Sequence, residues 1–202
     1  GPLIEYATLR EYMKKNVKKV LWMYYEGNDL GELDVELLNN ILVKYLENKK
    51  FSQNLINKQN EINLKVDEKI SSEKNIRLKS TIFKFIKLTK VRYLFIVKPQ
   101  QIIRPEFKQV LLSAKNLVKQ NNSKLYFVYL PEYARYKSNF DNTNYLKIKK
   151  ILSELDIPLI DLHTEIFIKE KDPTDLYPFN SFGHYNELGY KKVADKIYKL
   201  TQ

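Results

Sequence analysis

The sequence contains no cysteine, and it has only two histidines and five glycines among its 202 residues. Without cysteine the chain can form no disulfide, no thiolate metal site and no cysteine nucleophile. The two histidines, His163 and His184, are too few for the usual zinc sites, which combine histidine and cysteine ligands. We therefore expect no metal site, and no other cofactor is implied.

The chain also lacks an apolar run of about 18 residues, the length that a membrane-spanning helix needs. No secretory signal is recognisable at its start. Apolar residues nevertheless make up 44% of the sequence, enough for the core of one domain. We expect residues 1–202 to form a single domain, and both the cytoplasm and a bacterial cell envelope stay open as its location.

Positive charge is in excess, with 35 Lys and Arg against 24 Asp and Glu and a formal net charge of +11. This excess fits an anionic surface as a partner, but a composition rich in lysine and asparagine accounts for it equally, and we favour that explanation. Specific nucleic-acid binding is not expected. Lysine outnumbers arginine, which is the better phosphate ligand, and no known nucleic-acid-binding module is present.

Three short apolar runs have the composition of buried strands, at residues 18–25, 125–130 and 157–162. Segments with helical periodicity lie before, between and after them, at residues 3–13, 33–46, 104–118, 145–155 and 186–200. Strands separated by helices predict a parallel sheet with helices on both of its faces. The expected fold class is therefore α/β.

Residues 48–88 interrupt this alternation with a segment that is first polar and then mixes phenylalanine with lysine. The segment is longer than a simple crossover between parallel strands requires. We expect a helical insertion, which either caps a site, lies in a membrane interface or packs plainly on the body. Residues 91–97, which follow it, have strand composition.

The first candidate motif, Glu26-Gly27-Asn28-Asp29, directly follows the first expected strand. Ligands of open α/β sheets bind at the carboxyl ends of the strands. The amide of Asn28, beside the flexible Gly27, can donate a hydrogen bond to a developing oxyanion. The same residues also suit an ordinary turn.

The second candidate motif is Phe182-Gly183-His184-Tyr185-Asn186, just before the last expected helix. His184 can act as a general base, and Asn186 suits the N-cap of the helix. A histidine base usually needs an orienting carboxylate, for which Asp172 and Asp175 are candidates. His184 could also be a surface histidine, and both acids could be solvated turn residues. His163 is a weaker candidate base.

Together the two motifs resemble blocks of the SGNH (GDSL-like) hydrolase family. Gly27-Asn28-Asp29 resembles the third block. The stretch from His184 to Tyr190, with Gly189 before that tyrosine, resembles the last block. The resemblance implies a flavodoxin-like three-layer α/β/α sandwich with a parallel sheet and a serine esterase site. It implies that Asn28 is the oxyanion-hole amide and that His184 is the base that activates the serine.

The sequence departs from the family pattern in three places. The block with the nucleophilic serine is absent and would precede Gly1, and the glycine of the second block is missing or is at best Gly1. The position three residues before the histidine, usually an aspartate, is Ser181. The orienting acid is then Asp175 or Asp172, or the enzyme uses a Ser–His dyad. Ser181 itself is poorly placed as a nucleophile, because it is too close in sequence to the base.

The missing first strand would lie inside the sheet of such a fold, so its absence leaves neighbouring strand edges unpaired. We therefore expect that the protein continues upstream or that another chain supplies this strand. The expected function is ester hydrolysis or acyl transfer on a small acyl ester or an acylated carbohydrate or lipid.

The alternative function is an inactive module that binds a glycan or an anionic envelope surface. Tyrosines near the strand tips would suit sugar stacking, or equally core packing: Tyr24, Tyr25, Tyr129, Tyr133 and Tyr136. The sequence leaves the oligomeric state open.

Overall fold

The structure is a computed structural model that describes residues 1–86, 101–181 and 183–202, with the side chains of residues 73–86 left out of the description. The chain divides into two compact units, of which the first comprises Gly1–Phe51 and Gln101–Gln202 and the second Ser52–Gln100. Within the described residues, no helix has the length and apolar character needed to cross a membrane.

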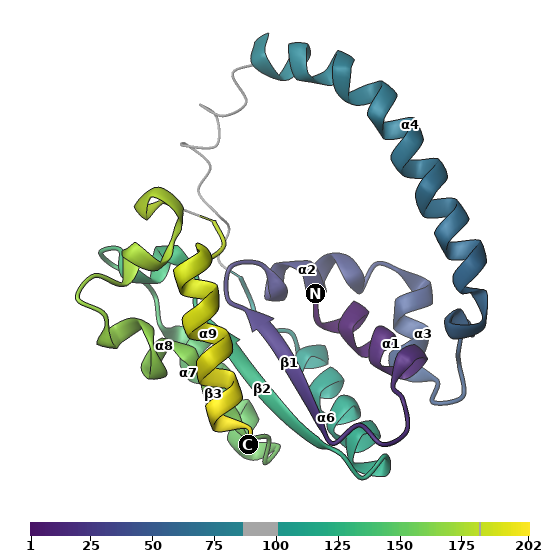
Figure 1. The fold of residues 1–202 in the computed structure, drawn as a ribbon. Helices are drawn as coiled ribbons and strands as arrows, with labels where there is room; N and C mark the ends of the chain where they lie inside the picture. The colour runs from purple at the N-terminus through teal and green to yellow at the C-terminus, as the bar shows by residue number, and fades with distance from the viewer. Residues whose placement is uncertain (87–100, 182) are drawn as a thin grey trace. The chain divides into compact units, whose positions relative to one another are not determined.

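The first unit holds three strands with helices between them (Figure 1). The strands are β1 (Lys19–Tyr25), β2 (Lys124–Leu130) and β3 (Leu159–Asp161). The α-helices are α1 (Pro2–Tyr12), α2 (Asp29–Glu36), α3 (Asn40–Glu47), α6 (Pro105–Gln120), α7 (Thr143–Glu154), α8 (Leu162–Glu165) and α9 (Glu187–Leu200). Short 3₁₀ turns complete the unit: η2 (Tyr133–Tyr136), η3 (Phe167–Lys169), η4 (Pro173–Leu176) and η5 (Pro178–Asn180).

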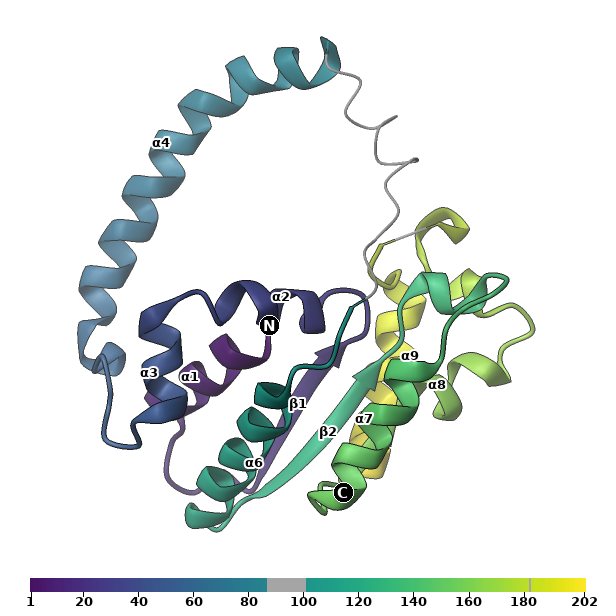
Figure 2. The ribbon, with the colours of Figure 1, turned by 180° about the vertical axis from the view of Figure 1, so that it is seen from behind.

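The strands form a parallel sheet in the order β1-β2-β3, in which Trp22 lies opposite Phe127 and Phe127 opposite Leu159. The α/β class and the parallel arrangement of the three expected strands are thus confirmed. Helices α6 and α7 cover one face of the sheet and α8 and α9 the other (Figures 1 and 2). This arrangement is compatible with a three-layer α/β fold.

Two apolar cores lie on the two faces of the sheet. On the α6 side, the rings of Tyr24 and Phe127 stack at 5.3 Å and Phe107 meets Tyr24 edge-on. On the α9 side, Val128 packs with Phe167 and the surrounding aromatic rings. Because successive residues of β2 serve opposite cores, this strand is buried on both faces, which explains its uninterrupted apolar composition.

The helix expected over residues 33–46 is wrong in its extent, since the structure has two helices there. α2 begins already at Asp29 and ends at Glu36, and α3 begins at Asn40. Asn39 lies in extended conformation between them, and its Oδ1 accepts hydrogen bonds from the backbone N–H groups of Ile41 and Leu42. This N-cap starts a new helix within a continuous apolar periodicity.

The second unit contains the 3₁₀ turn η1 (Leu55–Lys58) and the long helix α4 (Gln59–Ile86). An ion pair between Lys65 and Glu61, one turn apart, stabilises the exposed first part of α4. The expectation that residues 48–88 form a cap stays a prediction. The strand expected at residues 91–97 lies outside the described residues.

Candidate functional site

The carboxyl end of β1 is fixed by a tight turn into α2. Asp29, the first residue of α2, accepts a hydrogen bond at 2.8 Å from the backbone N–H of Tyr25, the last residue of β1. Burial of this carboxyl group raises its pKa to about 6, although the bond from Tyr25 acts in the opposite direction. Asp29 therefore has a structural role in the first candidate motif, because its carboxylate accepts the last N–H of β1.

Gly27 permits a close approach within this turn. A Cβ atom added at Gly27 would lie 2.5 Å from Cε1 of Tyr25, which is closer than non-bonded carbon atoms come. The carbonyl of Gly27 accepts a hydrogen bond from Nε2 of Gln101 at 3.0 Å. The absence of a Cβ at Gly27 therefore lets the ring of Tyr25 pack against the turn. The hydrogen bond from Gln101 fixes the backbone of the turn.

Tyr25 also joins this turn to the loop that carries His184. Its hydroxyl donates to the carbonyl of Gly183 at 3.2 Å, and its ring centroid lies 5.1 Å from that of His184. The residue directly before the first candidate motif therefore contacts the second motif, which lies more than half the chain away in sequence. No hydrogen bond joins Asn28 to His184 within the described residues.

The loop before α9 is anchored where the helix begins. As predicted, Asn186 is the N-cap, and its Oδ1 accepts from the N–H of Gly189 at 2.9 Å. The amide of Asn186 donates to the carbonyl of Asp175 at 2.7 Å. A Cβ at Gly189 would lie 2.6 Å from the carbonyl oxygen of Leu176, so glycine allows α9 to approach η4 closely.

Asn28 and His184 are both exposed. The amide of Asn28 donates to Oε1 of Glu32 at 2.5 Å. No side chain in the described part of the chain hydrogen-bonds to the ring of His184. The imidazole is thus open to a ligand, and the amide of Asn28 gives one of its two N–H groups to Glu32.

The two candidate acids make local contacts of their own. Asp172 caps η4, because its Oδ1 accepts from the N–H and the hydroxyl of Thr174, and these bonds lower its pKa. Asp175 accepts from the amide of Asn180 at 2.8 Å. Neither acid forms a hydrogen bond or ion pair with His184 within the described residues. The choice between the two acids, or of a dyad, stays a prediction.

His163 lies on α8, the short helix that directly follows β3. Its Nδ1 is 3.1 Å from the hydroxyl of Tyr136, and its ring meets that of Tyr145 edge-on. Burial lowers the pKa of this histidine, and the charge of Arg135 lowers it further. Its neighbours suit a neutral, packed imidazole better than an exposed base.

A buried polar network at the same end of the sheet escaped the sequence analysis. Glu26 accepts hydrogen bonds from Arg135, from the hydroxyl of Tyr129 and from the N–H of Glu132, and so joins the ends of β1 and β2. Arg135 also donates to Oδ1 of Asn142 at 2.6 Å. An acid directly after a strand and an arginine within a tyrosine-rich turn are the only sequence signals of this network.

The tyrosines considered for sugar stacking divide into two groups. Tyr24 and Tyr129 are each only 1% exposed and belong to the core, so the stacking interpretation is wrong for them. Tyr25, Tyr133 and Tyr136 keep partial exposure. Of these, Tyr133 donates its hydroxyl to the carbonyl of Asn180.

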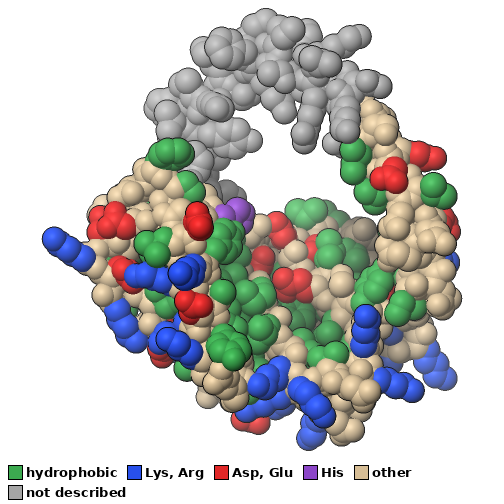
Figure 3. All heavy atoms as spheres, viewed as in Figure 1, with side chains coloured by type: hydrophobic (Ala, Val, Ile, Leu, Met, Phe, Trp, Pro, Cys, Tyr) green, Lys and Arg blue, Asp and Glu red, His purple; other side chains and the backbone are tan. Residues whose placement is uncertain are grey.

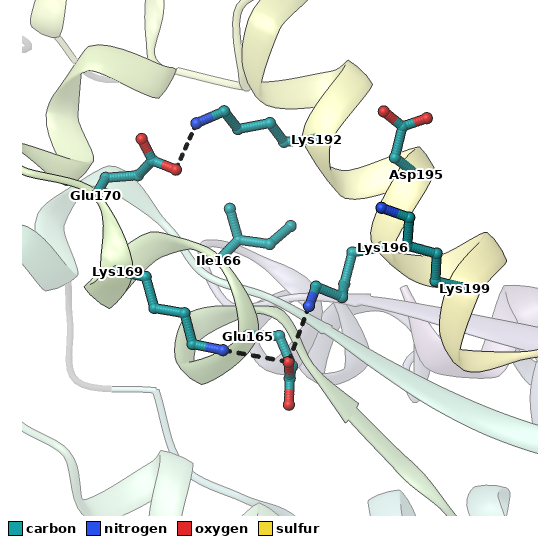
Figure 4. A pocket seen from close by; sticks show the side chains of 8 residues that line it. All are labelled: Glu165, Ile166, Lys169, Glu170, Lys192, Asp195, Lys196 and Lys199. Carbon is teal, nitrogen blue, oxygen red and sulfur yellow. Dashed lines mark hydrogen bonds and ion pairs between the residues drawn. The ribbon is translucent and has the colours of Figure 1, made fainter.

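A groove of about 310 Å³ between α9 and the segment from α8 to η3 shows how the lysines are arranged (Figure 4). Glu165 pairs with Lys169 and Lys196, and Glu170 pairs with Lys192 at 2.5 Å. Glutamates thus neutralise three of the lysines that line this groove, which weakens the case for an anionic ligand there.

The described residues include no group of histidine, aspartate and glutamate side chains that could hold a metal ion. Comparisons of the chain with models of known protein families, with curated proteins and with solved structures found no match.

Proposed function

We propose that this chain forms the larger part of an SGNH-type ester hydrolase or acyltransferase domain with a flavodoxin-like sheet. The contact of Tyr25 with the loop of His184 carries the proposal, because it places the second motif at the strand end that the first motif follows. The consecutive parallel order β1-β2-β3 is also what one half of such a sheet would have.

In the proposed reaction a serine hydroxyl attacks the carbonyl carbon of an acyl ester. His184 takes the proton from the serine and passes it to the departing alcohol, while the amide of Asn28 donates to the oxyanion. His184 then takes the proton of a water or an acceptor hydroxyl, whose oxygen attacks the acyl carbon, and gives that proton to the departing serine oxygen. The serine would come from a segment that precedes Gly1.

The contact between Asn28 and Glu32 bears directly on this proposal. A carboxylate beside the oxyanion would oppose the developing negative charge, so Glu32 has to turn away when substrate binds. The side chain of Glu32 is 46% exposed and also pairs with the ammonium group of Gly1 at 2.7 Å, so turning away means leaving this ion pair for solvent. Replacement by glutamine should therefore leave the proposed activity intact or raise it.

The test compares this chain with a version that carries its natural preceding sequence, using p-nitrophenyl acetate and a fluorophosphonate that labels activated serines. We expect turnover and labelling only for the longer protein. His184→Ala should then reduce turnover by several orders of magnitude, and Asn28→Ala by about 100- to 1000-fold. Glu32→Gln serves as the matched control.

Two outcomes would contradict the proposal. Labelling of Ser181 in this chain alone would assign the nucleophile to a residue that the proposal rejects. A folded longer protein without turnover or labelling would favour the alternative of a module that binds a glycan or an envelope surface.

A further inference from the structure

The excess positive charge of the chain is concentrated where α1, α3 and α6 end. The last turn of each helix and the loop after it comprise residues 9–18, 44–51 and 117–123, which hold eight lysines and arginines against two acids, Glu11 and Glu47. These 25 residues therefore carry a net charge of +6 out of +11 for the whole chain. Figure 3 shows several Lys and Arg side chains around the ends of α1 and α3, at the lower right. A general richness in lysine does not explain this concentration.

Arg10, in the last turn of α1, holds the end of α3 in place. Its guanidinium donates hydrogen bonds to the carbonyl groups of Tyr45, Asn48, Lys49 and Phe51. The last carbonyl groups of a helix carry a partial negative charge, which this cation offsets. The lysines around the same helix ends are therefore not needed to balance the carbonyl groups of α3.

A groove of about 540 Å³ opens between these helix ends, with α6 on one side and residues of α1 and α3 on the other. A space of this size suits a small molecule. The lining includes three cations and no acid: Arg10, Lys49 and Lys119. Neither lysine has an ion-pair partner among the described residues. In the groove beside α9, by contrast, glutamates pair with the lysines.

The wall that α6 contributes is polar but uncharged. Ser113, Asn116 and Gln120 line the groove, and their spacing of three and four residues puts them on one face of the helix. Their side chains form no hydrogen bond with another described residue. A hydroxyl and two amides can each donate and accept hydrogen bonds, as the hydroxyl groups of a sugar do. Leu46 and Leu117 supply apolar surface in the same groove for the C–H groups of a sugar ring.

We propose that this groove binds a phosphorylated sugar, whose phosphate faces Lys49 and Lys119 and whose hydroxyl groups bond to the polar wall of α6. A nucleic acid fits less well, because single-strand binding uses exposed aromatic rings. The one aromatic residue in the lining, Tyr6, is only 6% exposed. The site does not depend on the esterase function proposed above, since the groove lies at the helix ends that precede β1 and β2, whereas Asn28 follows β1.

NMR titration of the chain with glucose 6-phosphate, inorganic phosphate and glucose tests the proposal. We expect glucose 6-phosphate to shift the amide signals of residues 113–120 with a Kd on the order of 0.1–1 mM, as is usual for a weak ligand of this size. Phosphate and glucose each provide only part of the contacts and should bind at least about tenfold more weakly, a difference of ~1.4 kcal/mol. Added salt should weaken the binding of glucose 6-phosphate.

Two variants with matched controls separate the groove from the general charge of the chain. Lys119→Gln should raise the Kd for glucose 6-phosphate about tenfold, because it removes a cation from the phosphate. Lys147→Gln makes the same change at an exposed position of α7 and should leave the Kd unchanged. Asn116→Asp keeps the shape of the side chain but places a carboxylate in the groove, so it should weaken binding at least as much. Asn139→Asp, at an exposed loop position, is its control.

The changed side chains are exposed, and a cooperative urea transition establishes for each variant that it is folded. Equal affinity for inorganic phosphate and glucose 6-phosphate would reveal an unselective basic surface and would overturn the proposal. Equal losses for Asn116→Asp and Asn139→Asp would have the same consequence, because only net charge would then matter. A single-stranded oligonucleotide that displaces glucose 6-phosphate and binds far more tightly would assign the groove to nucleic acid and would also overturn it.

Discussion

Glu26, the residue after β1, and Arg135, in the turn after β2, form an ion pair whose side chains are only 9% and 3% exposed. Arg135→Met would leave the carboxylate of Glu26 buried without its cation. We expect the free energy of unfolding to fall by about 3–5 kcal/mol, measured by urea denaturation. Because Glu26 precedes Gly27, the same change should also disturb the turn that positions Asn28.

The exposed pair of Lys108 and Glu154, at 2.5 Å, is the matched control for this prediction. Its side chains are 47% and 41% exposed, so Lys108→Met should cost less than about 1 kcal/mol. The double variant Glu26→Leu with Arg135→Met should recover part of the lost stability, because it removes both buried charges. Similar losses for the two single variants would contradict the importance of burial.

Two glycines on either side of Asn28 give opposite expectations. Gly27→Ala places a Cβ at 2.5 Å from the ring of Tyr25, so the ring or the turn must shift, at a cost of about 1–3 kcal/mol. Gly31→Ala, inside α2, meets no atom closer than 3.9 Å and should stabilise the protein by up to ~1 kcal/mol through helix propensity. Thermal unfolding distinguishes the two signs.

Gly27→Ala should also weaken the contact between Tyr25 and the loop that carries His184. The ring of Tyr25 contacts His184, so a displaced ring should change the NMR signals of the imidazole. The same signals should stay unchanged in Gly31→Ala. An unperturbed His184 spectrum in both variants would show that Tyr25 does not hold the loop of His184.

The division into two units predicts that the first unit folds without the second. Replacement of Ser52–Gln100 by a flexible Gly-Ser linker of ~20 residues, which spans on the order of 25 Å, should leave the sheet and both of its cores in place. We expect a single cooperative urea transition and retained slow exchange of β2 amides. A variant without a cooperative transition would show that the second unit is part of the core.

The strands could be predicted from sequence because their apolar runs are short and bounded, although β1 is buried mainly on one face and β2 on both. The helical periodicity of residues 33–46 did not reveal the boundary between α2 and α3, because the apolar spacing continues across Asn39. An N-cap depends on one side chain and on backbone angles, and periodicity is insensitive to both. The pairing of Tyr25 with the loop of His184 was not predictable in detail, since two distant segments must meet for it to form.

The network of Glu26 and Arg135 shows why the rest of the site stayed hidden. Each residue alone looks like a solvated charge in a loop, and only their burial together gives them a structural role. Asp29 is a different case, because its partner, the N–H of Tyr25, is only four residues away and the bond depends on the conformation of the turn. Hydrogen-bond partners distant in sequence leave no periodic signal.

The last prediction concerns Glu5 of α1, whose Oε2 is buried without a hydrogen-bond partner among the described residues. Burial raises its pKa to about 8, and Asp29, Glu36 and Glu32 add to the rise, while the ammonium group of Gly1 opposes it. The folded state therefore keeps a proton that the unfolded chain releases near the reference value of 4.5. The resulting stability is fully present below that reference value and is lost as the pH rises towards the folded pKa.

We expect the free energy of unfolding to decrease between about pH 5 and pH 8, with Asp29 contributing over the lower part of this window because its pKa is raised to about 6. Glu5→Gln keeps the shape of the side chain without its titration and should flatten the dependence over the upper part. Glu61→Gln, on the exposed start of α4, is the control and should leave the slope unchanged. Urea denaturation across this range measures the slope. If Glu5→Gln kept the full slope up to pH 8, the buried carboxyl group of Glu5 would not be its source, and the prediction would be wrong.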